Sequence, residues 1–151
     1  MKAFVSVYIV FATCIAVSLQ STPFVPCDEG PTPTELRAEG CNSSPCYFYR
    51  GTDFNAQWDF VANADTKSLK PRVRVTVMGS TINYPYPRPN ACEDLINSEC
   101  PLDDGDEATY NVSMPISKLY PSLTLTIEFS LVDDYNHVQV CFKIDGKVTD
   151  K

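Results

Sequence analysis

The sequence contains one histidine, His137, which limits the catalytic chemistry open to the chain. A Ser–His or Cys–His pair would need His137 as its general base, held beside a nucleophile by the tertiary fold. His137 directly follows Asp133-Asp134-Tyr135-Asn136, a cluster of residue types typical of a turn between two strands. We therefore interpret His137 as a solvated turn residue and expect that the protein is not an enzyme.

The N-terminal segment has the pattern of a secretory signal peptide. Lys2 precedes an apolar run over residues 3–17, and small residues follow where cleavage would occur. The run is too short for a membrane span, which needs about 20 apolar residues. We predict a signal peptide over residues 1–18, one domain over residues 19–151, and a secreted, extracellular location.

Loss of this segment would remove Cys14 and leave an even set of cysteines. An even set in an oxidising compartment predicts three disulfides, and six cysteines allow fifteen pairings. Paired sulfurs offer no thiolate, which argues against a thiol nucleophile and against zinc bound by thiolate and imidazole. We expect no metal and no cofactor. The six remaining cysteines are Cys27, Cys41, Cys46, Cys92, Cys100 and Cys141.

Acidic side chains cluster at Asp103-Asp104-Gly105-Asp106-Glu107, the one segment that could coordinate calcium. The cluster does not match the calcium-loop template of spaced carboxylates, a glycine and a later glutamate. We interpret it as a solvated acidic turn. No carboxylate pair stands out for glycoside chemistry, whose geometry is a tertiary property.

The charge of the chain argues against some partners. Without Lys2, the 12 basic residues become 11 against 19 acidic residues, so the net charge is near −8. Nucleic acids and anionic membranes attract basic surfaces, whereas this chain is acidic. We therefore expect neither as the main partner. Two sequons, at Asn42 and Asn111, are compatible with glycosylation on the secretory route.

Strands are the elements that would position these groups. Apolar and polar residues alternate with a period of two, as in strands with one buried face, and turn clusters separate the segments. Seven or eight short strands of this kind predict an all-β, two-sheet antiparallel sandwich. The clear segments are 54–60, 73–77, 123–131 and 138–144, and the weaker ones are 36–38, 46–49, 82–86 and 110–114.

Aromatic residues alternate with prolines in Tyr84-Pro85-Tyr86-Pro87-Arg88-Pro89. Proline fixes its own φ and disfavours helix at the preceding residue, so this segment should be extended and stiff. Prolines also remove ladder donors, which places the segment at a sheet edge or rim. Its two tyrosines are either exposed recognition residues or packed against the core, and composition leaves both open.

From residue 27 to residue 148 the sequence resembles the ML lipid-recognition family, especially its Niemann–Pick type C cholesterol-binding branch, with the group-two mite allergens as relatives. The matching pieces follow one another along nearly the whole mature chain. They are Cys41…Pro45-Cys46, Met78-Gly79, Tyr84-Pro85-Tyr86-Pro87-Arg88-Pro89…Cys92, Cys100-Pro101, Met114-Pro115-Ile116, Tyr120-Pro121-Ser122, Glu128-Phe129 with Leu131, Asp133-Asp134 and Cys141-Phe142.

The resemblance implies an immunoglobulin-like sandwich whose sheets enclose an apolar lipid cavity. It also implies the pairing Cys27–Cys141, Cys41–Cys46 and Cys92–Cys100. The implied function is to hold a sterol or fatty acid and deliver it to a membrane or receptor, as a monomer, with the lysosome as an alternative location. A second hypothesis is a semiochemical carrier or an innate-immune lipid-sensing module that acts through a protein partner.

The residues at the family's pocket positions are ones that the alternating pattern places on the inner face of their strands. The implied lining residues are Val73, Val77, Leu125, Ile127, Phe129, Phe142 and Ile144, and the implied entrance residues are Tyr84, Ile116 and Tyr120. Ile82 and Tyr86 complete the predicted lipid-binding set. Departures from the sterol carrier concern Tyr84 and Tyr86, where it has phenylalanine and isoleucine, and Phe129 and Phe142, where it has tryptophan. The sequon on its second strand is absent near Gln57. Ligand identity is therefore not implied in detail.

Overall fold

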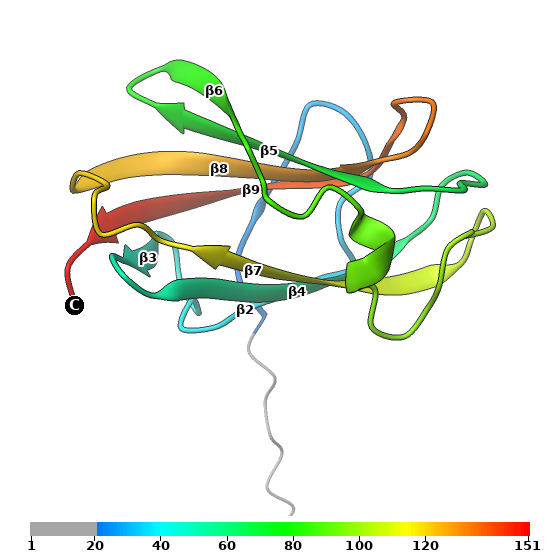
Figure 1. Cartoon of the computed structure of the whole chain (residues 1–151), viewed down its shortest axis with the longest axis horizontal. Coiled ribbons are helices and arrows are strands. Elements are labelled where there is room, and N and C mark those ends of the chain that lie inside the picture. The colour runs from blue at the N-terminus through cyan, green and yellow to red at the C-terminus, as the bar shows by residue number, and fades with distance from the viewer. Residues whose placement is uncertain (1–20) are drawn as a thin grey trace, which may run out of the picture.

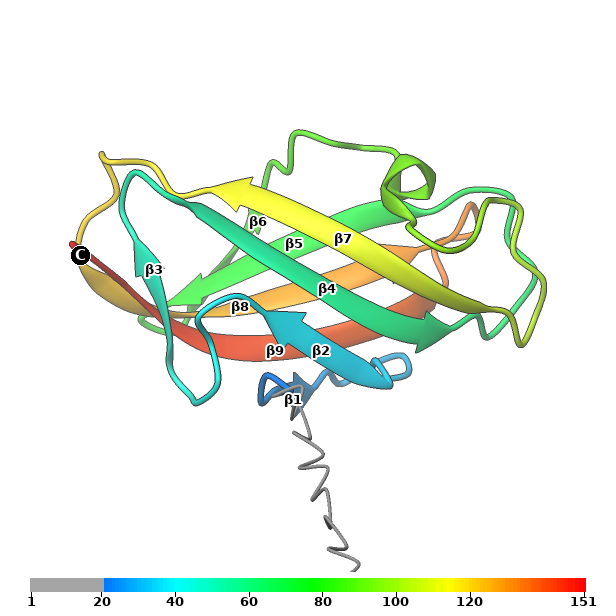
Figure 2. The ribbon, with the colours of Figure 1, turned by 90° about the horizontal axis from the view of Figure 1, so that it is seen from below.

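The computed structural model describes residues 21–151, which form two β-sheets packed face to face (Figure 1). The predicted signal peptide, residues 1–18, lies outside the described residues. Seen from the perpendicular direction, the strands of one sheet cross those of the other at an angle (Figure 2). The described part of the chain contains no helix with the length and apolar character that a membrane crossing requires.

The larger sheet has six strands and the smaller has three. The larger follows the order β1 (Val25–Pro26), β9 (Val138–Thr149), β8 (Leu123–Val132), β5 (Lys70–Val77) and β6 (Ser80–Tyr84), with β3 (Cys46–Tyr49) also paired to β9. The smaller follows the order β2 (Glu35–Ala38), β4 (Asp53–Val61) and β7 (Glu107–Pro115). A short 3-10 helix, η1 (Ala91–Asp94), lies between β6 and β7.

Each predicted strand is present, with some differences at the ends. The predicted segment 82–86 ends at Tyr84 as the edge strand β6, because the prolines that follow cannot donate to a ladder. Two elements were not predicted: β1 has only two residues, too few to show alternation, and η1 is a single turn. The β3–β9 pair is parallel, whereas the sequence predicted an antiparallel sandwich. A hairpin forces its two strands to pair antiparallel. β3 and β9 are far apart in sequence and are not joined by a hairpin, so parallel pairing is open to them.

The inner faces of the sheets meet around Trp58. Its ring lies 4.7 Å from that of Tyr110, 4.9 Å from Phe142 and 5.7 Å from Phe129, measured between centroids. Trp58 and Tyr110 are direct cross-strand partners on β4 and β7, while both phenylalanines belong to the opposite sheet. Aromatic packing between the sheets therefore fills this part of the sandwich.

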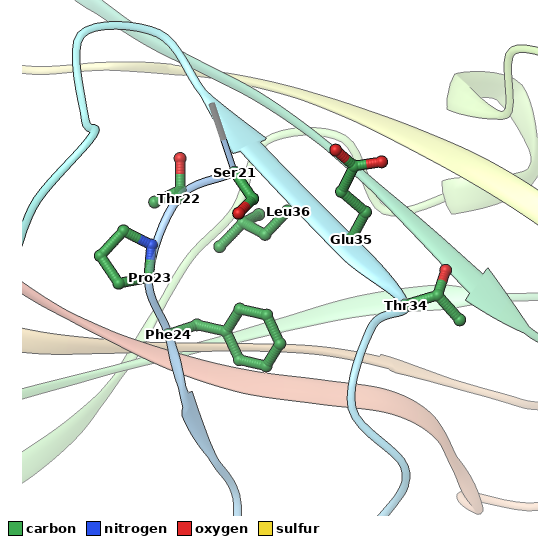
Figure 3. Close-up of a pocket in the computed structure, with 7 residues that line it drawn as sticks. All are labelled: Ser21, Thr22, Pro23, Phe24, Thr34, Glu35 and Leu36. Carbon is green, nitrogen blue, oxygen red and sulfur yellow. The ribbon is translucent and has the colours of Figure 1, made fainter. Parts of the chain in front are cut away.

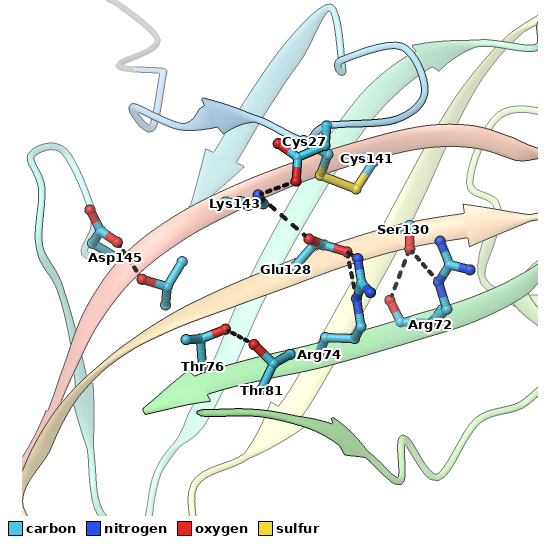
Figure 4. A network of polar contacts seen from close by, with 12 residues as sticks. Cys27, Arg72, Arg74, Thr76, Thr81, Glu128, Ser130, Cys141, Lys143 and Asp145 are labelled. Atoms are coloured by element: carbon cyan, nitrogen blue, oxygen red, sulfur yellow. Dashed lines mark hydrogen bonds and ion pairs between the residues drawn. A yellow bond between two sulfur atoms is a disulfide. The ribbon is translucent and has the colours of Figure 1, made fainter. Parts of the chain in front are cut away.

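The outer face of the larger sheet carries a network of polar side chains from β5, β8 and β9 (Figure 4). Glu128 on β8 pairs with Arg74 on β5 and lies 3.9 Å from Nζ of Lys143 on β9, which are its cross-strand partners. The glutamate is only 8% exposed, and these two cations offset the cost of burying its charge. This ladder holds the register of β5, β8 and β9.

Three disulfides staple the fold in the pairing that the resemblance implied: Cys27–Cys141, Cys41–Cys46 and Cys92–Cys100. The first joins residues 114 apart and fastens the segment after β1 to β9. In the chain-entropy model a bridge of that span contributes about 5 kcal/mol. Such a contribution offsets packing energy that a sandwich loses when it keeps an internal cavity.

Candidate functional site

An apolar cavity of about 390 Å³ lies between the sheets at the end of the sandwich that carries β3 and the β5–β6 turn. Both sheets contribute to its wall, and among the described residues that line it the only polar side-chain groups are the hydroxyls of Tyr84 and Tyr120. The lining residues are Phe48, Val75, Val77, Ile82, Tyr84, Pro85, Met114, Pro115, Ile116, Tyr120, Pro121, Leu123, Leu125, Ile127 and Val148.

Tyr84, at the end of edge strand β6, and Tyr120, in the connection from β7 to β8, line the cavity without being fully buried, and we take the mouth to lie between them. Burial, and then the neighbouring Tyr120 hydroxyl, raise the pKa of Tyr84 to about 12. The Tyr84 phenol is therefore neutral at physiological pH, able to donate or accept a hydrogen bond without adding charge. The mouth is suited to a neutral polar group such as a hydroxyl.

Seven of the twelve predicted lipid-binding residues line this cavity: Val77, Ile82, Tyr84, Ile116, Tyr120, Leu125 and Ile127. The other five do not. Val73, Phe129, Phe142 and Ile144 are buried further along the sandwich, where the aromatic rings around Trp58 fill the space, and Tyr86 packs against the same core. A role of any of the twelve in lipid binding stays a prediction.

Eight of the lining residues were not predicted from the sequence. Val75 and Leu123 have the same inward places in the alternation as the predicted residues, so that signal could have found them. Phe48 and Met114 also point inward by alternation, but they lie on strands for which the resemblance implied no lining residue. Val148 lies on β9, beyond the implied lining residues Phe142 and Ile144. Pro85 and Pro121 line the cavity from connections whose path no periodicity describes, and Pro115 lines it from the last position of β7.

Tyr86 lies beside Tyr110 at the inner end of the aromatic core. Burial, and then the charge of Tyr86, raise the pKa of Tyr110, and burial also raises that of Tyr86. Neither hydroxyl has a hydrogen-bond partner among the described residues, nor does Nε1 of Trp58. Of the two options that composition left open for Tyr86, the structure therefore shows the packed one.

Large apolar side chains gather on the outside of the mouth. Met78, at the β5–β6 turn, is 98% exposed, and Leu119, next to Tyr120, is 92% exposed. Ile82 and Tyr120 are exposed on one side while they line the cavity on the other. We call these four residues, Met78, Ile82, Leu119 and Tyr120, the apolar rim. Exposed apolar groups beside a cavity often mark a contact with another molecule or a membrane.

A second depression, of about 480 Å³, lies where the described chain begins, beside β2 (Figure 3). Its wall includes Ser21, Thr22, Thr34 and Glu35, with Phe24 and Leu36 as its large apolar residues. Because polar side chains make up much of this surface, it lacks the continuous apolar wall that would hold a lipid. The cavity between the sheets is therefore the better candidate for a lipid site.

The reactive and acidic groups considered from the sequence do not line the cavity. The His137 side chain is 70% exposed in a turn, with Nδ1 3.4 Å from Oδ2 of Asp133. In the acidic turn, the backbone N–H of Asp103 donates to the Asp106 carboxylate at 2.8 Å. Cys27 and Cys141 lie near Glu128, but their sulfurs are joined and offer no thiolate to a metal.

The two sequon asparagines differ in exposure. Asn42 is exposed in the Cys41–Cys46 loop. Asn111 is half-buried on β7, and its side-chain oxygen accepts a hydrogen bond from Nε2 of Gln57 at 3.4 Å. Glycosylation of either residue stays a prediction, and the structure offers a more accessible amide at Asn42.

A two-sheet sandwich with an apolar cavity open at one end defines a class of small proteins that can enclose an apolar ligand. The ML domain family model matches residues 21–148, and the chain belongs to this family.

Individual relatives agree with this assignment. The chain is 29% identical over 114 residues to the NPC intracellular cholesterol transporter 2 of Bos taurus, covering 76% of this chain and 75% of that protein. It is 27% identical over 118 residues to the mite group 2 allergen Der f 2 of Dermatophagoides farinae, covering 77% and 79%. The crystal structure of a Niemann-Pick type C2 protein from the Japanese carpenter ant has the same fold, with a TM-score of 0.77, 21% identity, and coverage of 84% of this chain and 99% of that one.

Proposed function

We propose that this protein is a lipid carrier that holds a sterol or fatty acid in the cavity between its sheets. The observation that supports the proposal is the cavity itself, whose described wall is apolar except for the hydroxyls of Tyr84 and Tyr120 at the mouth. Removal of apolar ligand surface from water would supply roughly 25 cal/mol per Å² as the driving force. The name of the bovine relative, a cholesterol transporter, supports a sterol as the first ligand to test.

Delivery would take place at the apolar rim. A membrane or a receptor that contacts Met78 and Leu119 would lie directly over the mouth, so the ligand could pass without crossing water. The acidic net charge of the chain disfavours lasting attachment to anionic lipid, which suits a transient contact.

The remaining parts of the proposal concern how and where the protein acts. Binding and release need no catalytic step and no cofactor, so we propose that it is not an enzyme. The signal-peptide pattern and the three disulfides support a secreted, extracellular or lysosomal location. We propose that it acts as a monomer.

The test is to identify the ligand. Protein purified from a secreting host is extracted with organic solvent, and the extract is analysed by mass spectrometry. The stripped protein is then titrated with cholesterol and, separately, with oleic acid. We expect about one bound lipid per chain and saturable binding of at least one of the two. An empty extract together with no binding of either lipid would contradict the proposal.

A further inference from the structure

One side of the cavity mouth is fastened by Arg50, the residue that follows β3. Its Nε and Nη2 donate to Oδ1 and Oδ2 of Asp150 at 2.8 and 2.5 Å, and its Nη1 donates to the carbonyl oxygen of Tyr120 at 3.1 Å. The planar guanidinium thus joins two segments that lie far from it in sequence. A bidentate carboxylate fixes the plane of a guanidinium, so Asp150 aims Nη1 at the Tyr120 carbonyl.

The turn that follows Arg50 binds the same loop at its other end. We call residues 116–121 the mouth loop. The N–H of Gly51 donates to the carbonyl of Ile116 at 2.6 Å, and the N–H of Ile116 donates to the carbonyl of Thr52 at 2.8 Å. Ile116 and Tyr120 both line the cavity. The mouth loop is therefore held near its start by two backbone bonds and near its end by one side chain.

These two anchors differ in how readily they can be released. The bonds at Ile116 continue the end of β7 and are part of the backbone framework. The bond at Tyr120 comes from one side chain, on a segment whose neighbour Leu119 is almost fully exposed. If the mouth lies between Tyr84 and Tyr120, a ligand would leave by displacing one of them. Because Arg50 binds the backbone carbonyl of Tyr120, a shift of the Tyr120 backbone would break that bond.

We propose that Arg50, held by Asp150, is a positioning residue that keeps Tyr120 in the cavity wall and sets the rate at which ligand enters and leaves. The proposal deepens the proposed function, on which it rests for the identity of the ligand. Arg50 does not line the cavity, so its effect on ligand exchange acts through the mouth loop.

Arg37 provides a matched control. Its guanidinium donates to both carboxylate oxygens of Asp59 at 2.7 and 2.8 Å, joining β2 to β4 in the smaller sheet. The side chains of Arg37 and Arg50 are similarly exposed, at 26% and 23%. Arg37 does not line the cavity. Arg37→Met and Arg50→Met therefore each remove an arginine that donates two hydrogen bonds to an aspartate, one away from the mouth and one beside it. Arg37 also pairs with Glu35 at 3.0 Å, so its loss tests the removal of at least as much ion pairing.

The experiment measures release of dehydroergosterol, a fluorescent sterol, from loaded protein into excess phosphatidylcholine vesicles. We expect Arg50→Met to release it about fivefold faster than wild type, the factor for loss of one hydrogen bond of about 1 kcal/mol. Arg37→Met should release it at the wild-type rate. Denaturant unfolding should show that both variants are less stable than wild type. Asp150→Asn should give a smaller acceleration, because Nη1 can still reach Tyr120. Wild-type release from Arg50→Met, or equal acceleration in Arg37→Met, would overturn the proposal.

A second measurement needs no ligand and separates this proposal from the function itself. Amide hydrogen exchange of stripped protein should be faster in residues 116–121 of Arg50→Met and unchanged there in Arg37→Met. Unchanged exchange in Arg50→Met would refute the positioning role even if sterol binds. If wild type binds neither cholesterol nor oleic acid, the proposed function fails, and exchange alone decides whether Arg50 holds the loop.

Discussion

The ring of Phe48 lies directly on the backbone of Gly146: a β-carbon added to Gly146 would stand 1.9 Å from Cε2 of Phe48. The two residues meet because β3 pairs in parallel with β9, which sets Cys46 opposite Gly146. The Phe48 ring also packs edge-on against Phe54, with 4.9 Å between centroids, and lines the cavity. The absence of a side chain at residue 146 therefore sets the position of one cavity wall.

Gly146→Ala should destabilise the protein and weaken lipid binding. The new methyl group must push the Phe48 ring toward Phe54 or into the cavity, and overpacking of this kind costs about 1–3 kcal/mol. Denaturant unfolding and sterol titration measure the two effects. Adding Phe48→Leu to Gly146→Ala should recover part of the stability, since it removes the clash. Wild-type stability of Gly146→Ala would show that the ring is not confined as described.

Tyr84→Ala and Tyr120→Ala should each weaken lipid binding by about 1–3 kcal/mol, the scale of a lost buried aromatic contact. Tyr135→Ala, in the exposed turn near His137, is the control for loss of a tyrosine outside the cavity. Circular dichroism must first show that all three variants fold. Wild-type affinity in both mouth variants would refute the assignment of the entrance.

Tyr84→Phe separates two modes of recognition. A lipid held only by its apolar body should bind as well to phenylalanine or better. A lipid whose polar group meets the Tyr84 hydroxyl should lose about 0.5–1.5 kcal/mol. The comparison requires the same titration with cholesterol and with oleic acid, because their polar groups differ in charge. We expect the loss with cholesterol, since the raised pKa of Tyr84 keeps its phenol neutral.

Stability should fall in alkaline solution partly because of Tyr84. Its pKa is raised to about 12 in the folded protein, against about 10 in an unfolded chain. The neutral phenol therefore contributes stability that is complete below about pH 10 and is lost as the pH rises through about 12. Denaturant unfolding across this window should show a shallower loss for Tyr84→Phe, which cannot ionise. Parallel curves for wild type and Tyr84→Phe would contradict the shift.

His137→Ala should leave both lipid binding and the fold intact. The turn is held by Oδ1 of Asp133, which accepts the backbone N–H groups of Tyr135 and His137 at 2.8 Å each, and the substitution keeps both bonds. Loss of affinity greater than about tenfold, or ~1.4 kcal/mol, in a folded variant would reopen the catalytic hypothesis that the lone histidine raised.

Much of this architecture is predictable from the chain because alternation is a local property. Phe54, Trp58 and Phe60 share one face of a strand in sequence and in structure alike. Alternation also turned Val73 and Val77 inward, yet only Val77 reaches the cavity. Some inward residues face the cavity and others face the aromatic rings around Trp58. How the two sheets cross decides between these, and the crossing depends on residues distant in sequence. The Arg50–Asp150 pair could not be predicted for the same reason, because its members are 100 residues apart.

Cavity filling offers the decisive experiment on whether lipid lies between the sheets. Leu125→Trp places a large ring in the cavity, and Val61→Trp places one on the exposed end of β4 as the control. Titration of stripped protein with cholesterol and oleic acid should show wild-type affinity in Val61→Trp and a loss of more than about tenfold, or ~1.4 kcal/mol, in Leu125→Trp. Equal affinity in wild type and a folded Leu125→Trp would place the ligand elsewhere and contradict the proposed function of this cavity.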